Sequence, residues 1–130
     1  MIRALKVVLV LWGAIHILLG LALIVVPYQA AGMFGFGEIA DYVPYIMGLW
    51  GACFIASSVW VIAAGRDPLR HISWVKFAIL WSILSVVVGL YSIVRGAADF
   101  SQVGPGIITD AVFAVAFLVF YPYRAARSGQ

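Results

Sequence analysis

Two ionisable residues, His16 and Asp110, lie deep inside long apolar segments of the sequence. Ionisable side chains are rare in such segments, where they pair with one another or take part in moving protons and solutes. Counted at about 1.5 Å per helical residue from Lys6 and from Tyr121, both lie about 15 Å from the same edge of an apolar layer about 30 Å thick. We therefore expect His16 and Asp110 to share a depth and to contact each other, directly or through water.

Two hydroxyl groups on other apolar segments fall at nearly the same level. With the two ionisable residues they form a candidate polar layer of His16, Ser57, Ser82 and Asp110. If Asp110 does not contact His16, its expected partner is Arg95 or Tyr91. Two roles fit this layer: a proton relay or small-solute site, or a set of hydrogen bonds that fixes how helices pack.

The remaining residues do not have the spacing of a known catalytic or ligating site. Haem held by two histidines would need a second ring at the depth of His16, and His71 lies at the boundary of its apolar segment. Cys, His and carboxylate residues do not cluster as metal ligands do, and the serines lack the G-x-S-x-G context of a hydrolase nucleophile. We expect no catalytic residues, no cofactor and no metal.

The composition indicates that lipid is the main solvent of this chain. Of its 130 residues, 65% are hydrophobic and 10% are charged, and the mean hydropathy is +1.12. A water-soluble domain of this size needs more charge to cover its surface. The basic residues form no stripe with interleaved aromatics, so nucleic acid is not an expected partner.

Four apolar segments are long enough for membrane-spanning helices, at about 4–26, 43–64, 70–95 and 105–123. They predict an all-α fold: an antiparallel bundle of four transmembrane helices in one domain, 1–130. The first segment could instead be a signal peptide, but its apolar core is too long and residues 28–31 offer no A-x-A site, so we expect a retained helix.

The connections between these segments carry their own signals. Glycines and aromatics alternate in the connector 27–42, which favours a loop or short helix at the membrane surface. The turn 66–71 is short enough to make the second and third helices neighbours. Pro105 is expected in the first turn of the last helix, where its missing N–H is tolerated.

A line of small residues marks one face of the third segment. Steps of three and four residues place its members on one side of a helix. In lipid, small and hydroxylated residues let helix backbones approach closely, so this seam predicts a packing surface for the rest of the chain or for a second copy. The seam consists of Ala78, Ser82, Ser85, Gly89, Ser92 and Gly96.

The charges are distributed unequally between the two ends of the expected bundle. The end with the two termini and the turn 66–71 has seven basic residues and a single acid, Asp67. The other end has one basic residue, Arg95, with Glu38, Asp41 and Asp99. Basic residues gather on the cytoplasmic side of membrane proteins, so both termini are expected in the cytoplasm. The basic residues of the first end are Arg3, Lys6, Arg66, Arg70, Lys76, Arg124 and Arg127.

Two short motifs carry a family resemblance. Gly48-Leu49-Trp50-Gly51-Ala52 and Arg66-Asp67-Pro68-Leu69-Arg70-His71 resemble those of uncharacterised bacterial four-helix integral membrane proteins. The resemblance covers the middle half of the chain. It implies the four-helix fold and a multi-pass location in a bacterial inner membrane, and no activity is attached to it.

The expected function is that of a small structural or accessory subunit of a membrane assembly. Its expected partners are the lipid bilayer and other membrane subunits or further copies of the chain. The alternative is a proton-linked small-solute carrier or channel component that uses His16 and Asp110.

Overall fold

The computed structural model describes residues 1–123, which form five helices and no strands. They are α1 (Ile2–Val25), α2 (Pro27–Met33), α3 (Val43–Ala64), α4 (Ile72–Val94) and α5 (Phe100–Phe120). All except α2 are long and apolar enough to cross a membrane. The expectation of an all-helical chain with four long apolar helices is confirmed.

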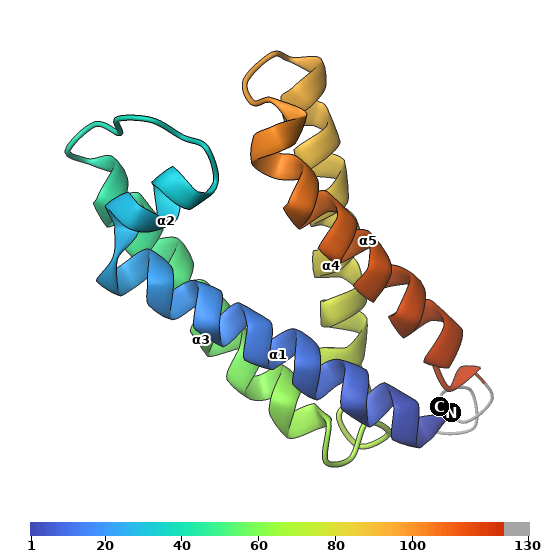
Figure 1. The fold of residues 1–130 in the computed structure, drawn as a ribbon. Coiled ribbons are helices and arrows are strands. Elements are labelled where there is room, and N and C mark those ends of the chain that lie inside the picture. The colour runs from blue at the N-terminus through green and yellow to red at the C-terminus, as the bar shows by residue number, and fades with distance from the viewer. Residues whose placement is uncertain (124–130) are drawn as a thin grey trace.

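The four long helices form two pairs. Helix α1 packs mainly against α3, and α4 packs mainly against α5. The pairs meet near the start of α1 and diverge toward the other end of the molecule (Figure 1). As expected, the short turn after α3 keeps α3 and α4 in contact near that turn, where the rings of Trp60 and Trp74 stack with their centroids 5.9 Å apart. The main packing partner of α3, however, is α1.

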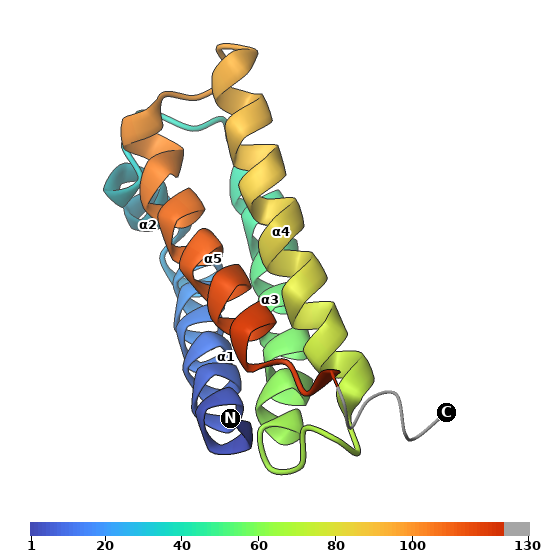
Figure 2. The same ribbon diagram turned by 90° about the vertical axis from the view of Figure 1, so that its right-hand side faces the viewer.

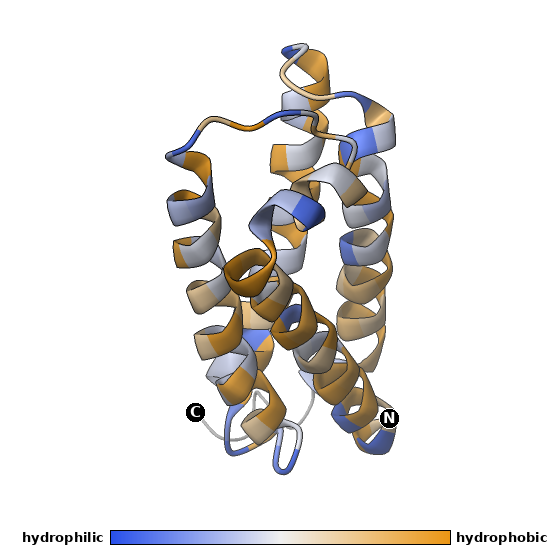
Figure 3. Cartoon of the chain, turned by 60° about the vertical axis from the view of Figure 1, so that its left-hand side comes forward, coloured by the Kyte–Doolittle hydropathy of each residue, from blue (hydrophilic) through white to orange (hydrophobic). Residues whose placement is uncertain are grey.

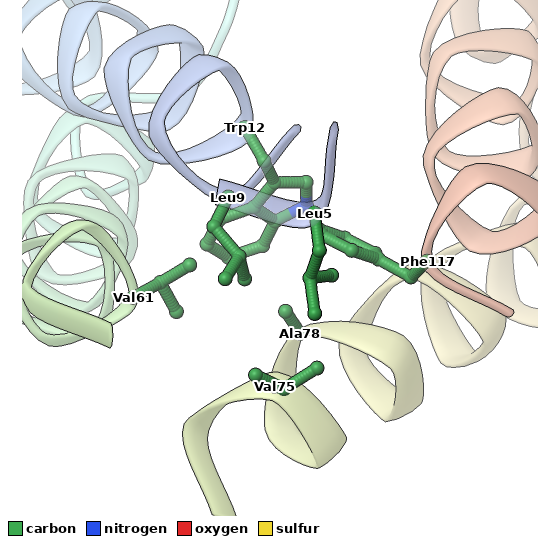
Figure 4. Packing of buried hydrophobic residues seen from close by; sticks show 7 residues of the cluster. All are labelled: Leu5, Leu9, Trp12, Val61, Val75, Ala78 and Phe117. Carbon is green, nitrogen blue, oxygen red and sulfur yellow. The ribbon is translucent and has the colours of Figure 1, made fainter. Parts of the chain in front are cut away.

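The two pairs share one apolar core. Its side chains come from all four long helices and point toward one another (Figure 4). The largest, Trp12 and Phe117, are fully buried and bridge α1 and α5. The core therefore joins the pairs at the end where they meet, and consists of Leu5, Leu9, Trp12, Val61, Val75, Ala78 and Phe117.

Glycines bring α1 and α3 into backbone contact. A Cβ atom added at Gly20 would lie 2.7 Å from the carbonyl oxygen of Gly51, and one at Gly51 would lie 2.5 Å from that of Gly20. Such approaches are closer than a side chain allows. Each glycine therefore makes room for the other helix, as small residues do in membrane helix pairs.

Helix α5 begins five residues before the expected start at 105. Asp99 and Gln102 form a capping box, in which Gln102 Oε1 accepts a hydrogen bond from the Asp99 backbone N–H at 2.8 Å. This cap provides hydrogen-bond partners for backbone N–H groups at the helix start, so the helix begins at Phe100. Pro105 consequently lies in the second turn, not the first.

The other long helices begin and end within two residues of their expected bounds. Helix α4 stops at Val94 because Gly96, at a φ of 67°, adopts the left-handed conformation that favours glycine. The N–H of Ala97 then bonds the carbonyl of Ser92 at 2.9 Å, closing a Schellman motif.

Polar residues concentrate at the two ends of the long helices, and the middle is predominantly hydrophobic (Figure 3). The connector after α2 passes the start of α5 (Figure 2). There Gln102 Nε2 donates a hydrogen bond to the carbonyl of Gly35 at 3.0 Å. The helix pairs are thus joined by the apolar core at one end and by this polar contact toward the other.

Candidate functional site

His16 lies on α1, one turn beyond Trp12, and is 5% exposed. Its Nδ1 hydrogen-bonds the Trp12 carbonyl at 2.8 Å, so Nδ1 carries the proton because a carbonyl can only accept. The imidazole stacks on the Trp12 ring, with the ring centroids 3.9 Å apart. It also makes an edge contact with Phe54 on α3, with a centroid distance of 5.3 Å. The histidine is therefore held by aromatic rings and by its own helix.

Asp110 lies on α5 and is half-buried. Its Oδ1 atom is buried and has no hydrogen-bond partner. The polar side chain beside this carboxyl group is Ser85 of α4. Asp110 therefore faces the α4/α5 interface, and within residues 1–123 no hydrogen bond or ion pair connects it to His16.

The shared core explains this separation. His16 is four residues from Trp12, and Asp110 is seven residues from Phe117, which correspond to about 6 Å and about 10 Å along the helices. Asp110 thus lies about one turn farther from the core than His16 does. This offset arises because Lys6 and Tyr121, from which the two depths are counted, lie at unequal distances from the core.

The alternative partners expected for Asp110 also bond elsewhere. Arg95 Nη1 lies 3.5 Å from the hydroxyl of Tyr91, one turn earlier on α4. The Arg95 guanidinium also lies 5.7 Å from the Tyr91 ring centroid, within the range of a cation–π contact. These two residues form a local pair at the end of α4.

The two serines of the expected layer differ in their surroundings. Ser57 donates to the carbonyl of Cys53 at 2.8 Å and lies 3.2 Å from that of Phe54, so its hydroxyl bonds its own helix. Ser82 is fully buried and its hydroxyl has no partner. Ser82 is one turn from the core residue Ala78, the same distance that separates His16 from Trp12.

Two further buried polar groups lie close to the core. The Trp12 indole Nε1 and the hydroxyl of Ser58 are buried without hydrogen-bond partners. Ser57 is the expected member of the layer, but Ser58 is the serine that α3 turns toward α1, where its backbone approaches Gly13. The signal for Ser58 is its spacing of seven residues from the buried Gly51, which puts both on the α1 side of α3.

The small-residue seam of α4 faces the chain itself over most of its length. Ala78 and Ser82 are buried, and a Cβ atom added at Gly89 would lie 2.5 Å from Cγ1 of Ile107 on α5. At the far end of the seam, Gly96 has open space around it and serves to end the helix.

The arrangement supplies hydrogen-bonding capacity more than reactive chemistry. Its unpartnered atoms are three donors and one carboxylate oxygen, one atom from each long helix: Trp12 Nε1, Ser58 Oγ, Ser82 Oγ and Asp110 Oδ1. Such groups can bind water or a small polar solute. Within residues 1–123 no three His, Cys, Asp or Glu side chains lie together as metal ligands would.

Comparisons of the chain with protein-family models, with curated proteins and with solved structures found no match.

Proposed function

We propose that the chain is a multi-pass protein of a bacterial inner membrane, an antiparallel bundle of four transmembrane helices with both termini in the cytoplasm. Four long apolar helices support this proposal. So does the charge distribution, because Arg3, Lys6, Arg66, Arg70 and Lys76 stand against Asp67 at the end where the pairs meet. Arg124 and Arg127 lie outside the described residues.

Its proposed function is that of a small structural or accessory subunit, which binds other membrane proteins or further copies of itself. The observation that carries this proposal is an unoccupied line of small residues on α3: Gly48, Ala52 and Ala56, spaced four residues apart. Ala52 and Ala56 are exposed, and no atom lies within 4 Å of a Cβ added at Gly48. Small residues at this spacing let a second helix approach closely in lipid.

The contrast with Gly51 supports the assignment. Gly51 belongs to the same helix but is buried against Gly20 of α1. Helix α3 thus has two small-residue faces, one used within the chain and one directed outward.

A pair of leucine substitutions tests this function. In Gly48→Leu/Ala52→Leu the added side chains enter open space, so we expect an unchanged fold and at least tenfold weaker association. Association is measured by cross-linking in membranes and by the mass of the complex in mild detergent. The control Val87→Leu changes an exposed residue of α4 and should leave association intact.

If the wild-type protein is a monomer without co-purifying subunits, or if the double variant assembles as the wild type does, the subunit function is wrong.

A proton-linked carrier or channel component is the second candidate. It is favoured by the buried, unpartnered Oδ1 of Asp110 beside Ser85, because intramembrane carboxyl groups commonly serve proton and solute transport. In liposomes, Asp110→Asn should then abolish a pH-driven flux while the helical content stays unchanged. Equal fluxes from the two proteins, or no flux from either, would exclude this role.

A further inference from the structure

We propose that the start of α1 and the end of α3 form a binding site for an anionic glycerophospholipid. The phosphate group would lie between Lys6 and Arg66, and an acyl chain would lie along Val7, Val10 and Leu11. This inference rests on the proposed membrane location and goes beyond the proposed function.

The apolar part of the site is a shallow hollow on the surface of α1. The hollow has a volume of about 270 Å³ and is lined by Lys6, Val7, Val10 and Leu11. The three aliphatic side chains are between 43% and 58% exposed. An exposed aliphatic surface of this kind suits a hydrocarbon chain.

The lining of the hollow is apolar, and its one charged residue, Lys6, stands at the end nearer the start of α1. Lys6 and Val7 line the end of the hollow nearer the start of α1. Val10 and Leu11 lie one turn, about 6 Å, farther along the helix. A lipid whose charged group contacts Lys6 would therefore place its acyl chain over Val10 and Leu11. This is the direction in which a lipid enters the bilayer from the surface.

Helix α3 supplies the second charge. Gly65 lies against α1, since a Cβ added there would be 3.0 Å from Cγ2 of Val10 and 3.4 Å from the Lys6 carbonyl oxygen. Arg66 follows Gly65 directly and is exposed. The polypeptide thus brings a cation of α3 to the level of Lys6.

The nearby acid does not remove this positive charge from the site. Asp67 Oδ1 accepts a hydrogen bond from the backbone N–H of Arg70 at 3.2 Å, within the turn itself. Basic residues at a membrane surface attract anionic lipids, and each contributes about threefold to fivefold in affinity. Lys6 and Arg66 together should then favour an anionic lipid over a zwitterionic one by on the order of tenfold.

The experiment is a lipid titration of the full-length protein in neutral detergent, followed by native mass spectrometry. The probes are phosphatidylglycerol, phosphatidylcholine with the same acyl chains, and inorganic phosphate. We expect phosphatidylglycerol to bind about tenfold more tightly than phosphatidylcholine. Inorganic phosphate should not compete, because it lacks the acyl chain.

Two double variants locate the site. Lys6→Gln/Arg66→Gln should reduce the preference for phosphatidylglycerol to about onefold to twofold. The matched control Arg70→Gln/Lys76→Gln removes two exposed charges from the same end of the molecule but outside the hollow, and it should keep the preference. Val10→Trp fills the hollow and should weaken the binding of both lipids.

Equal affinity of the wild type for the two lipids would overturn the inference, and so would an equal loss of preference in both double variants. Neither result bears on the subunit function, which is tested by association. Circular dichroism of each variant checks that its helices are retained.

Discussion

The two helix pairs achieve close packing by different means. Between α1 and α3, Gly20 and Gly51 face each other and the backbone of each helix blocks a side chain on the other. Between α4 and α5, Gly89 meets the side chain of Ile107, and the polar pair Ser85 and Asp110 lies in the same interface. At the contact between Gly20 and Gly51 the nearest atoms are backbone carbonyl oxygens, which cannot move aside easily, whereas the atoms nearest to Gly89 belong to a side chain.

This difference predicts that equal substitutions have unequal effects at Gly20 and at Gly89. A rigid backbone contact must open to admit a larger residue, and opening it separates the helices along their length. A contact with a side chain can adapt by a rotamer change, which requires less free energy.

The largest effect is expected for Gly20→Leu. The new side chain would collide with the Gly51 carbonyl, so α1 and α3 must separate, with a loss of about 3 kcal/mol or more in the free energy of unfolding. Equilibrium unfolding in mixed micelles measures it. A loss below about 1 kcal/mol would contradict the backbone contact.

Gly89→Ala should destabilise the protein by about 1 kcal/mol, because Ile107 must shift to make room. Shortening the neighbour should relieve the clash. In the double-mutant cycle, Ile107→Ala, which removes both Cγ1 and Cδ1, is therefore expected to recover about half of the loss caused by Gly89→Ala. Strict additivity of the two changes would show that the residues do not touch.

Gln102→Ala tests the polar link between the pairs. The variant loses the capping box of α5 and the hydrogen bond to the Gly35 carbonyl, so we expect a loss of about 1 kcal/mol. Hydrogen exchange at the first turn of α5 should increase as well. Unchanged exchange there would mean that the cap does not hold the helix start.

The smallest effect is expected for Asp110→Asn, within about 0.5 kcal/mol of the wild type. Oδ1 of Asp110 has no hydrogen bond to lose, and an amide is nearly isosteric with the carboxyl group. The same unfolding measurement applies. A loss above about 2 kcal/mol would indicate a strong partner for Asp110 in the membrane.

Hydropathy and helix signals predicted the four long helices, because a run of about 20 apolar residues identifies a spanning helix without tertiary information. The start of α5 was missed because Gly104 and Pro105 suggested a break, whereas the cap formed by Asp99 and Gln102 precedes them. A proline in the second turn removes only one backbone hydrogen bond. The stabilisation of the helix start by the cap is larger than this loss.

The candidate site was harder to predict than the fold. Depth along a helix follows from counting, but which side chains meet depends on the rotation and tilt of each helix. His16 turned toward Trp12 and Phe54, and Asp110 turned toward Ser85. The choice between Ser57 and Ser58 likewise depends on which face of α3 the glycine contact with α1 selects.

The central claim is that the chain crosses a membrane four times with the start of α1 and the α3–α4 turn on the cytoplasmic side. The most direct test is labelling of single cysteines with a membrane-impermeant maleimide in intact cells, in a Cys53→Ala background. Gly37→Cys and Ala97→Cys should be labelled, while Arg3→Cys and Leu69→Cys should react only after the membrane is opened. Labelling of Arg3→Cys and Leu69→Cys from opposite sides would contradict the account.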